Sequence, residues 1–271
     1  MDSVINRGRH NVLGVMIDAV DYDYAVDQVM TAAEQRRPLA LTALAVHGVM
    51  TGVDDPAHEA RLNSFDVTVP DGQPVRWALN SLYNTSLRDR VYGPDLTGYV
   101  LAELAHRGLP VFLYGSTPQT LNRLATTLPE KYPGLRIAGM RPSGFRVAEP
   151  GEAPDIAAEI RASGARCVLV GLGCPRQEVF AHALRAHLDL PLLAVGAAFD
   201  YHAGQLRTPP PWMQRYGLEW LWRLGLEPTR LWRRYLILNP RYATRLLGQR
   251  AGLWKPVPAP PERGAIERFP V

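Results

Sequence analysis

The chain has 271 residues, of which 46% are hydrophobic and 21% are charged, a composition typical of globular proteins and unlike that of disordered or fibrous ones. No apolar run approaches the ~20 residues that span a bilayer, and the N-terminal segment MDSVINRGRH lacks the apolar core of a signal peptide. The net charge of +4 is concentrated, since residues 207–250 hold nine arginines and two glutamates. This local basicity predicts docking to phosphate or anionic lipid and argues against general nucleic-acid binding.

Short apolar strands alternate with amphipathic helical stretches through most of the chain. This alternation predicts an α/β, Rossmann-like fold with a mostly parallel sheet and helices on both faces. Such sheets bind ligands at the carboxyl ends of their strands, so the loops after strands are where site residues are expected. Strands are predicted at 39–46, 67–69, 111–114, 135–138, 166–170 and 192–196, and helices at 24–36, 96–107, 119–131, 154–163 and 176–187.

The first part of the chain offers two site candidates. Asp21 and Asp23 form a D-x-D pattern that can hold a metal–nucleotide complex, but Asp23 is better explained as the N-cap of the helix predicted at 24–36. His47 follows the first predicted strand and is a candidate contact, with a purely structural histidine as the alternative. The seven histidines show no metal-ligand spacing, and the sequence predicts no metal site.

Asp71 lies in a short loop, Val69-Pro70-Asp71-Gly72, directly after a predicted strand. A carboxylate at the ligand-binding edge of a sheet can act as a general base. The alternative is a structural turn, since Asp-Gly is a common turn pair.

Two glycine-containing loops lead from a predicted strand into a helix. One contains Gly115 and Ser116, and the other, GLGCPRQE, begins with Gly171 and Gly173. Both bring backbone N–H groups to a helix N-terminus, where phosphate and other anions bind. These loops are therefore candidate ligand sites.

The second loop also resembles the start of a dinucleotide fingerprint. Arg176 replaces the third glycine of that pattern, so a nicotinamide-dependent oxidoreductase is the weakest of the readings that we consider. Gln177 is interpreted as a ligand contact. Glu178 is interpreted either as a contact or as a first-turn acid that complements the helix dipole.

The sequence divides into three parts. Residues 1–204 form the predicted core, residues 205–250 a helical appendage broken at Pro228, and residues 251–271 a Pro-rich flexible tail. In the appendage, Arg223, Arg230 and Arg233 return to one helical face and lie among four tryptophans. Arginine matches phosphate geometry and tryptophan favours wet apolar boundaries, so the appendage predicts an anionic, partly apolar partner, with a solvated basic face as the alternative.

The two cysteines give a hint of the compartment. Cys167 lies in an apolar run and Cys174 in the loop that follows it. Two such residues do not make a disulfide framework, which favours a reducing cytoplasm.

Short motifs follow one another in a fixed order along residues 12–245. They are Val69-Pro70-Asp71-Gly72, RVYGPDL from Arg90, YPG from Tyr132, GLGCPRQE from Gly171, GAAFD from Gly196, Gly204, RTP from Arg207, GLEWLWRL from Gly217 and EPTRL from Glu227. Each motif alone is weak, but the ordered series is specific, and it resembles the WecG/TagA/CpsF family of bacterial glycosyltransferases.

The resemblance implies a metal-independent, inverting glycosyltransferase without a cofactor, acting in cell-surface polysaccharide synthesis. Such an enzyme moves a sugar from a UDP-sugar to a polyprenyl-diphosphate-linked acceptor. It would be a cytoplasmic protein, peripheral on the inner face of the cell membrane, with the appendage touching the membrane surface. No nucleic acid is expected as a partner, and a homo-oligomer is compatible with the sequence.

The resemblance also assigns roles by position. Asp71 matches the proposed general base, and Arg90 and Gln177 match residues of the donor pocket that complete the catalytic set. The appendage arginines match residues thought to close over the diphosphate. The candidate substrate-binding residues are Thr42, His47, Gly72, Gly115, Ser116, Gly171, Gly173, Glu178, Phe199, Asp200, Arg207, Arg223, Arg230 and Arg233.

One departure from the family pattern bears on the donor. Family members carry Thr-x-Asn after an early strand, whereas here Thr42 is followed by Leu44 or Ala45 where the Asn would stand. His47 is a candidate replacement for that polar contact. The donor sugar is therefore open among N-acetylmannosamine, glucose and a uronic acid, and a noncatalytic, membrane-associated nucleotide-sugar sensor or scaffold is the alternative function.

Overall fold

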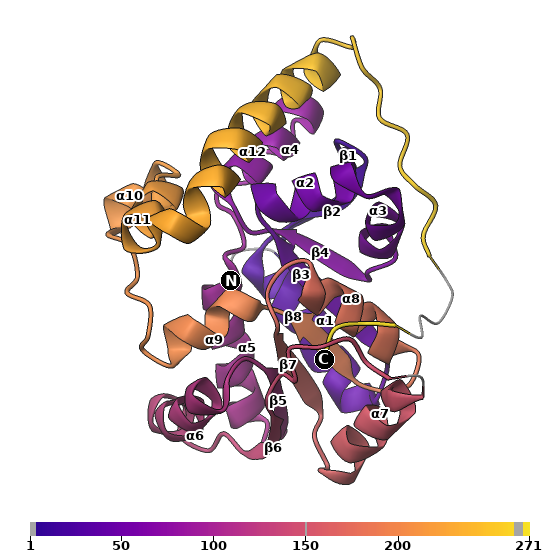
Figure 1. Cartoon of the computed structure of the whole chain (residues 1–271), viewed down its shortest axis with the longest axis vertical. Coiled ribbons are helices and arrows are strands. Elements are labelled where there is room, and N and C mark those ends of the chain that lie inside the picture. The colour runs from indigo at the N-terminus through magenta and orange to yellow at the C-terminus, as the bar shows by residue number, and fades with distance from the viewer. Residues whose placement is uncertain (1–3, 150, 263–267) are drawn as a thin grey trace.

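The computed structural model describes residues 4–149, 151–262 and 268–271. Its centre is a six-stranded parallel sheet in the order β4-β3-β8-β7-β5-β6 (Figure 1). The predicted α/β fold is thus confirmed, and each predicted strand is present with its ends shifted by a few residues. The strands are β3 (Leu39–Leu44), β4 (Val67–Pro70), β5 (Val111–Gly115), β6 (Ile137–Arg141), β7 (Cys167–Gly171) and β8 (Pro191–Ala194).

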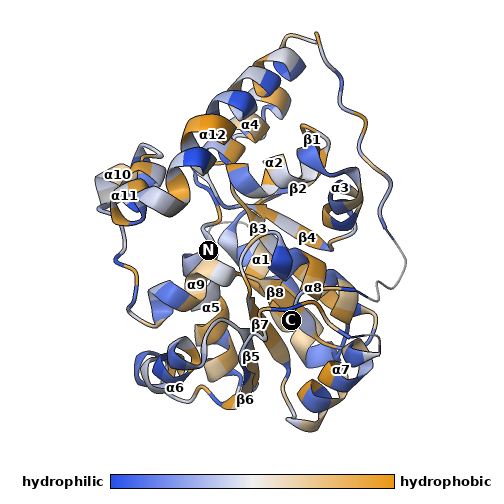
Figure 2. Cartoon of the chain, viewed as in Figure 1, coloured by the Kyte–Doolittle hydropathy of each residue, from blue (hydrophilic) through white to orange (hydrophobic). Residues whose placement is uncertain are grey.

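Helices cover both faces of this sheet because its side chains alternate between two apolar clusters. Leu39 and Leu41 belong to one cluster and Ala40, between them, to the other. In Figure 2 the strands are largely hydrophobic and the outer helices carry hydrophilic stripes. The first cluster is covered by α1 (Tyr22–Gln35), α5 (Gly93–His106), α6 (Pro118–Lys131) and α9 (Gly196–His202), and the second by α7 (Glu152–Ala162) and α8 (Arg176–Arg185).

A hairpin of β1 (Asn6–Val12) and β2 (Val15–Val20) precedes the sheet and was not predicted. Its turn residues Leu13 and Gly14 both have positive φ, 59° and 105°, the geometry of a tight hairpin turn. The hairpin shares a third apolar cluster with residues of α2 (Val46–Asp54), α3 (Pro56–Asn63), α4 (Gln73–Tyr83) and α12 (Pro228–Arg250).

The start of α1 corrects the prediction for Asp23. The N-cap is Asp21, whose Oδ1 accepts a hydrogen bond from the Tyr24 N–H at 2.9 Å, and Asp23 lies in the first helical turn. The other carboxylate oxygen of Asp21 accepts from the Ile5 N–H at 2.9 Å. Both oxygens of Asp21 therefore serve the backbone.

The appendage consists of α10 (Pro211–Arg215), α11 (Glu219–Leu226) and α12 (Pro228–Arg250). The predicted break at Pro228 is present, because this residue begins α12. The last helix is anchored on the core by buried Tyr242, whose hydroxyl donates to the Pro74 carbonyl at 3.2 Å, and by an Arg241–Asp54 ion pair at 2.6 Å. Within the described residues, no helix is long and apolar enough to cross a membrane.

The tail was predicted to be flexible, yet its described residues lie along the core. The Asn63 side chain donates to the Ala259 carbonyl at 3.0 Å, and the Ser143 hydroxyl donates to the Val271 carbonyl at 2.9 Å. Phe269 is 2% exposed and packs edge-on against Phe180 at a centroid distance of 5.9 Å. A composition rich in proline does not reveal such specific contacts.

Candidate active site

Two adjoining cavities lie where the strands end and where the appendage meets the core. The sheet-edge cavity, of about 400 Å³, opens over the loops that follow β3, β5, β7 and β8. The interface cavity, of about 110 Å³, lies between the core and helices α11 and α12. Ala45, Asp71 and Arg223 line both cavities, so these residues mark the passage between them.

Asp71 stands in this passage at the end of β4. Its Oδ1 accepts a hydrogen bond from the Gly93 N–H at 2.9 Å. Burial raises the pKa of Asp71 to about 6, against the lowering effect of Arg90 and of the Gly93 N–H, and Glu219 raises it further. A carboxylate with this pKa is ionised at neutral pH and still accepts a proton readily, as a general base must.

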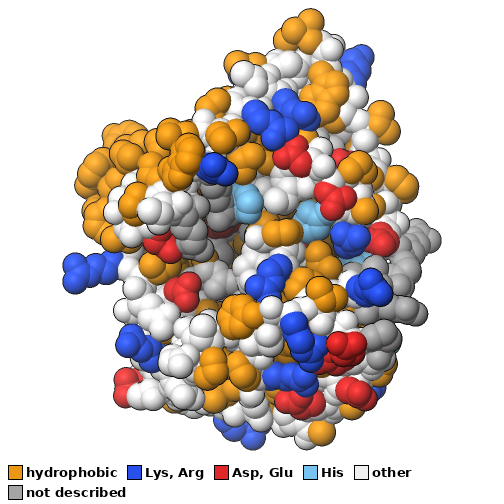
Figure 3. Space-filling model, in the orientation of Figure 1, with side chains coloured by type: hydrophobic (Ala, Val, Ile, Leu, Met, Phe, Trp, Pro, Cys, Tyr) orange, Lys and Arg blue, Asp and Glu red, His pale blue; other side chains and the backbone are white. Residues whose placement is uncertain are grey.

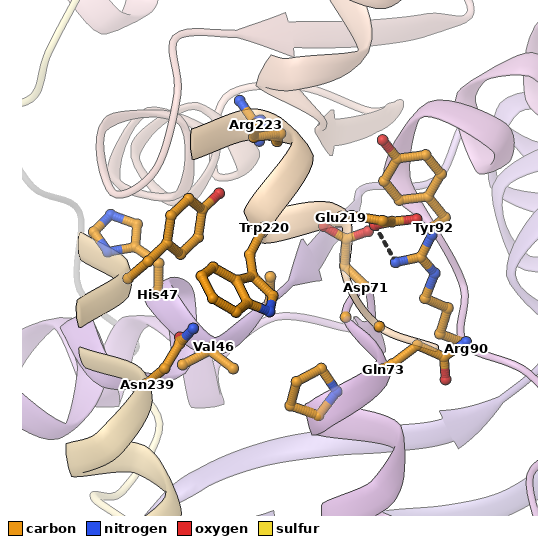
Figure 4. Close-up of a pocket in the computed structure, with 15 residues that line it drawn as sticks. Val46, His47, Asp71, Gln73, Arg90, Tyr92, Glu219, Trp220, Arg223 and Asn239 are labelled. Atoms are coloured by element: carbon orange, nitrogen blue, oxygen red, sulfur yellow. Dashed lines mark hydrogen bonds and ion pairs between the residues drawn. The ribbon is translucent and has the colours of Figure 1, made fainter. Parts of the chain in front are cut away.

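Arg90 is buried beside Asp71 and forms a two-fold ion pair with Glu219 of α11. Its guanidinium also stacks on the Tyr92 ring, 4.3 Å from the ring centroid. The pair links core and appendage across the interface cavity, as the dashed contact in Figure 4 shows. Glu219 was not predicted as a site residue, although the GLEW motif that contains it was part of the family resemblance.

Of the three appendage arginines predicted to bind substrate, two can be placed relative to the cavities. Arg223 lines both cavities and is half-buried. Arg233 is exposed, lines neither cavity and stacks on Trp232 at 5.2 Å. Arg230 belongs to α12, but its side chain lies outside the described residues.

The interface cavity is completed by two predicted residues, His47 and Gly72, and by three that were not predicted as site residues, Trp220, Tyr235 and Asn239. Trp220 lies in its middle, with His47 and Asn239 on one side and Asp71 on the other (Figure 4). His47 was predicted near the end of the first strand; it follows β3 and lies in the first turn of α2. Gly72 and Tyr235 line the same cavity. No local sequence signal separates these tryptophan and tyrosine residues from those that only pack.

The floor of the sheet-edge cavity is formed by two loops in close contact. Gly115 has a φ of 106°, and a Cβ there would lie 2.8 Å from the Gly171 carbonyl carbon. The Ser116 N–H donates to the Gly171 carbonyl at 2.8 Å. A Cβ on Gly171 would lie 2.5 Å from the ring of Phe199, so this position requires glycine. Phe199 is itself buried below the floor and does not line the cavity.

A buried polar network supports the far wall of this cavity. The Gln177 amide donates to Glu178 at 2.9 Å and to the Ala194 carbonyl at 3.2 Å, and its oxygen accepts from the Gly196 N–H at 2.7 Å. The Thr42 hydroxyl donates to Glu178 at 3.1 Å, and burial raises the pKa of Glu178. Gln177 lines the cavity, whereas Thr42 and Glu178 do not.

Of the remaining predicted site residues, some line a cavity and others do not. Gly173 and Asp200 line the sheet-edge cavity together with Ser116. Arg207 is exposed, lines neither cavity, and its carbonyl accepts a hydrogen bond from the Trp222 indole at 3.2 Å. Within the described part of the chain, no group of three or more His, Cys, Asp or Glu residues is arranged to hold a metal ion.

This geometry combines a parallel sheet, a glycine-floored cavity at its carboxyl edge, and a carboxylate at the passage to a second cavity. In a comparison with known protein families, residues 10–256 match the glycosyl transferase WecG/TagA/CpsF family. The match covers nearly the whole chain and includes every residue that lines the two cavities. Members transfer a sugar from a nucleotide-sugar donor to an acceptor in cell-surface polysaccharide synthesis, and this chain belongs to the WecG/TagA/CpsF glycosyltransferase family.

Proposed function

We propose that this protein is an inverting, metal-independent glycosyltransferase that moves a sugar from a UDP-sugar to a polyprenyl-diphosphate-linked acceptor. The UDP-sugar occupies the sheet-edge cavity, and the acceptor sugar enters the interface cavity. The observation that carries this proposal is the position of Asp71, which lines both cavities. A base at that position reaches the acceptor hydroxyl next to the donor.

The reaction follows from this arrangement. Asp71 removes the proton of the acceptor hydroxyl while that oxygen attacks the anomeric carbon of the donor. The new glycosidic bond forms as the bond to the diphosphate breaks, UDP leaves with the electron pair, and the configuration at the anomeric carbon inverts. The raised pKa of Asp71, about 6, keeps the carboxylate basic enough for this proton transfer.

The departing UDP needs positive charge near its diphosphate. Arg223 supports this role because it is half-buried and lines both cavities. A guanidinium in a partly desolvated site stabilises developing phosphate charge strongly. Arg233, which lines neither cavity, joins it in this proposal when α12 moves toward the site on substrate binding. That closure would also exclude water from the donor.

The appendage surface supports attachment to the inner face of the cell membrane. Figure 3 shows a large hydrophobic area over α10 and α11. Its members include Trp212 and Tyr216, which are 57% and 64% exposed, and Leu221. Exposed arginines such as Arg215 lie close by in the chain and attract anionic lipid.

The proposal is tested by incubating the protein with a panel of UDP-sugars and a short-chain prenyl-diphosphate-linked sugar, and by following product by mass spectrometry. The donor that serves as substrate also identifies the sugar. Nucleotide-sugar binding without any product under these conditions would refute the transferase and favour the noncatalytic sensor or scaffold, which the missing Thr-x-Asn pattern suggests.

A further inference from the structure

A third cavity, of about 490 Å³, adjoins the interface cavity, since Gln73 and Arg90 line both. We call it the arginine cavity. It lies between the core and α10 of the appendage. Four arginines line it, together with two acids: Arg76, Arg88, Arg90 and Arg215, and Asp89 and Asp95.

Two of these arginines already make hydrogen bonds or an ion pair within the protein. Arg76 donates to the Leu87 carbonyl at 2.8 Å and to the Gln73 side chain at 2.7 Å, which holds it in place. Arg90 is paired with Glu219. Both are therefore fixed walls of the arginine cavity.

The other two arginines are available to a ligand. Arg88 and Arg215 are exposed, and neither guanidinium has a hydrogen bond or ion pair to any described residue. Of the two acids that line the cavity, Asp89 accepts hydrogen bonds from the Gln73 amide at 3.1 Å and the Arg90 N–H at 2.8 Å, and Asp95 interacts electrostatically with Arg90 and Lys131. The cavity thus presents two exposed arginines without an ion pair to a described residue, one from the core and one from the appendage.

The three cavities adjoin one another in an order that fits the donor, then the acceptor sugar, then the diphosphate of a lipid-linked acceptor. Asp71 and Arg223 connect the sheet-edge and interface cavities, and Gln73 and Arg90 connect the interface and arginine cavities. An acceptor with its hydroxyl at Asp71 has its sugar in the interface cavity, and the next group along the molecule is the diphosphate. The helix that contributes Arg215, α10, also exposes Trp212, and the exposed Tyr216 follows it, so apolar surface for a lipid chain lies close to this cavity in the chain.

We propose that the arginine cavity binds the diphosphate of the acceptor and that Arg88 and Arg215 determine the preference for a diphosphate over a monophosphate. A diphosphate diester carries two negative charges, and each guanidinium can pair with one phosphate through two hydrogen bonds. Because Arg215 belongs to the appendage, the diphosphate also ties α10 to the core. This inference rests on the proposed function for the identity of the ligand.

Binding is tested with geranyl diphosphate and geranyl monophosphate as probes, by titration calorimetry of the full chain. The wild type is expected to bind the diphosphate at least tenfold more tightly than the monophosphate. The Arg88→Gln and Arg215→Gln variants should each lose about tenfold in diphosphate affinity, and the double variant should lose the discrimination. Arg250→Gln, which removes an exposed appendage arginine outside the three cavities, is the matched control and should bind as the wild type does.

UDP titration of the same variants shows whether the arginine cavity binds the donor or the acceptor. UDP affinity should be unchanged in the double variant, and a loss of UDP affinity would assign the cavity to the donor and overturn the inference. Equal affinity of wild type and double variant for geranyl diphosphate would overturn it as well. Melting temperatures show that the variants are folded, which the exposure of both side chains favours.

Kinetics separate this inference from the proposed function. With an active donor, the double variant should raise KM for a prenyl-diphosphate-linked acceptor about a hundredfold and leave KM for the UDP-sugar unchanged. If the double variant transfers sugar with an unaltered KM for the acceptor, the diphosphate subsite is refuted and the proposed transferase function is unaffected. If the geranyl phosphates bind as expected but no UDP-sugar supports transfer, the proposed transferase function is refuted and the anion-binding site is retained.

Discussion

The two walls of the active site are built differently. The core wall consists of strand ends and loops in close backbone contact, as at Gly115 and Gly171, above a buried Phe199. The appendage wall is α11, in which no described residue is fully buried and which is joined to the core chiefly by the Arg90–Glu219 pair. The core wall is therefore held by backbone contacts, whereas the appendage wall depends on a few side-chain contacts.

The pKa of Asp71 depends on charged residues of both walls. Asp71 is positioned by the core through the Gly93 N–H, while its pKa responds to Arg90 on the core side and to Glu219 and Arg223 on the appendage side. A movement of α11 would therefore change the pKa of Asp71. In the proposed mechanism, closure of the appendage would be coupled to the basicity of Asp71, and the following experiments separate the two walls.

The largest effect is expected from Asp71→Asn, which removes the proposed base and leaves the core wall in place. Transfer should fall by about 10²–10⁴-fold, measured as kcat, because that is the usual contribution of a general base. UDP affinity should be retained. Asp189→Asn, a change at an exposed residue outside the cavities, is the control and should keep full activity.

The same variant should be more stable than the wild type at pH 7. The folded-state pKa of Asp71 is raised above its ordinary value of 3.8 to about 6, so its ionisation destabilises the fold as pH rises through that window. The asparagine is neutral, and its oxygen still accepts the Gly93 hydrogen bond. A gain on the order of 1–3 kcal/mol is expected in urea unfolding at pH 7, absent at pH 3.5. Unchanged or lower stability at pH 7 would contradict the buried, raised-pKa carboxylate.

Arg223→Gln tests the appendage wall at the passage between the cavities. If Arg223 stabilises the leaving diphosphate, kcat should drop by roughly 10²-fold, the usual cost of losing one such charged donor. Arg250→Gln serves as the control on the same appendage. A normal kcat in the Arg223 variant would mean that the appendage does not act on the leaving group.

A pH profile tests the two walls together. Since the base must be ionised, kcat/KM should fall about tenfold per pH unit below a pH of about 6, and level off above it. In Glu219→Gln this limb should move to lower pH, because Glu219 raises the pKa of Asp71. An unshifted limb would mean that Asp71 does not sense α11.

The smallest effect on chemistry is expected from the contact that joins the walls. Glu219→Gln leaves Arg90 without its carboxylate, at a cost on the order of 1–3 kcal/mol for a hydrogen bond to a charged group. Limited proteolysis between residues 207 and 226 should accelerate, and kcat should fall several-fold, while the melting temperature of the core changes little. Equal protease resistance in variant and wild type would show that other contacts hold α11.

Much of the core wall could be predicted from the sequence because local patterns encode it. Apolar runs such as 111–114 and 166–170 show the buried parallel strands, and the loops that follow them come together at one sheet edge in any such fold. Asp71, Gly171 and Gly173 therefore appear where they were expected, beside the sheet-edge cavity. The hairpin of β1 and β2 was not predicted from the sequence, because only its second strand is strongly apolar.

The appendage wall illustrates what a sequence leaves open. Helical spacing placed three arginines on one face, yet of Arg223 and Arg233 only the first lines the cavities. The partner of Arg90 lies 129 residues away, and Phe269 of the tail packs on the second apolar cluster at the far end of the chain. The sequence by itself determined the parallel sheet, its ligand edge and the position of Asp71, because periodicity and turn chemistry act between near neighbours. Only the tertiary structure decided which arginine lines the cavities and which acid pairs with Arg90, because those positions depend on how distant helices pack.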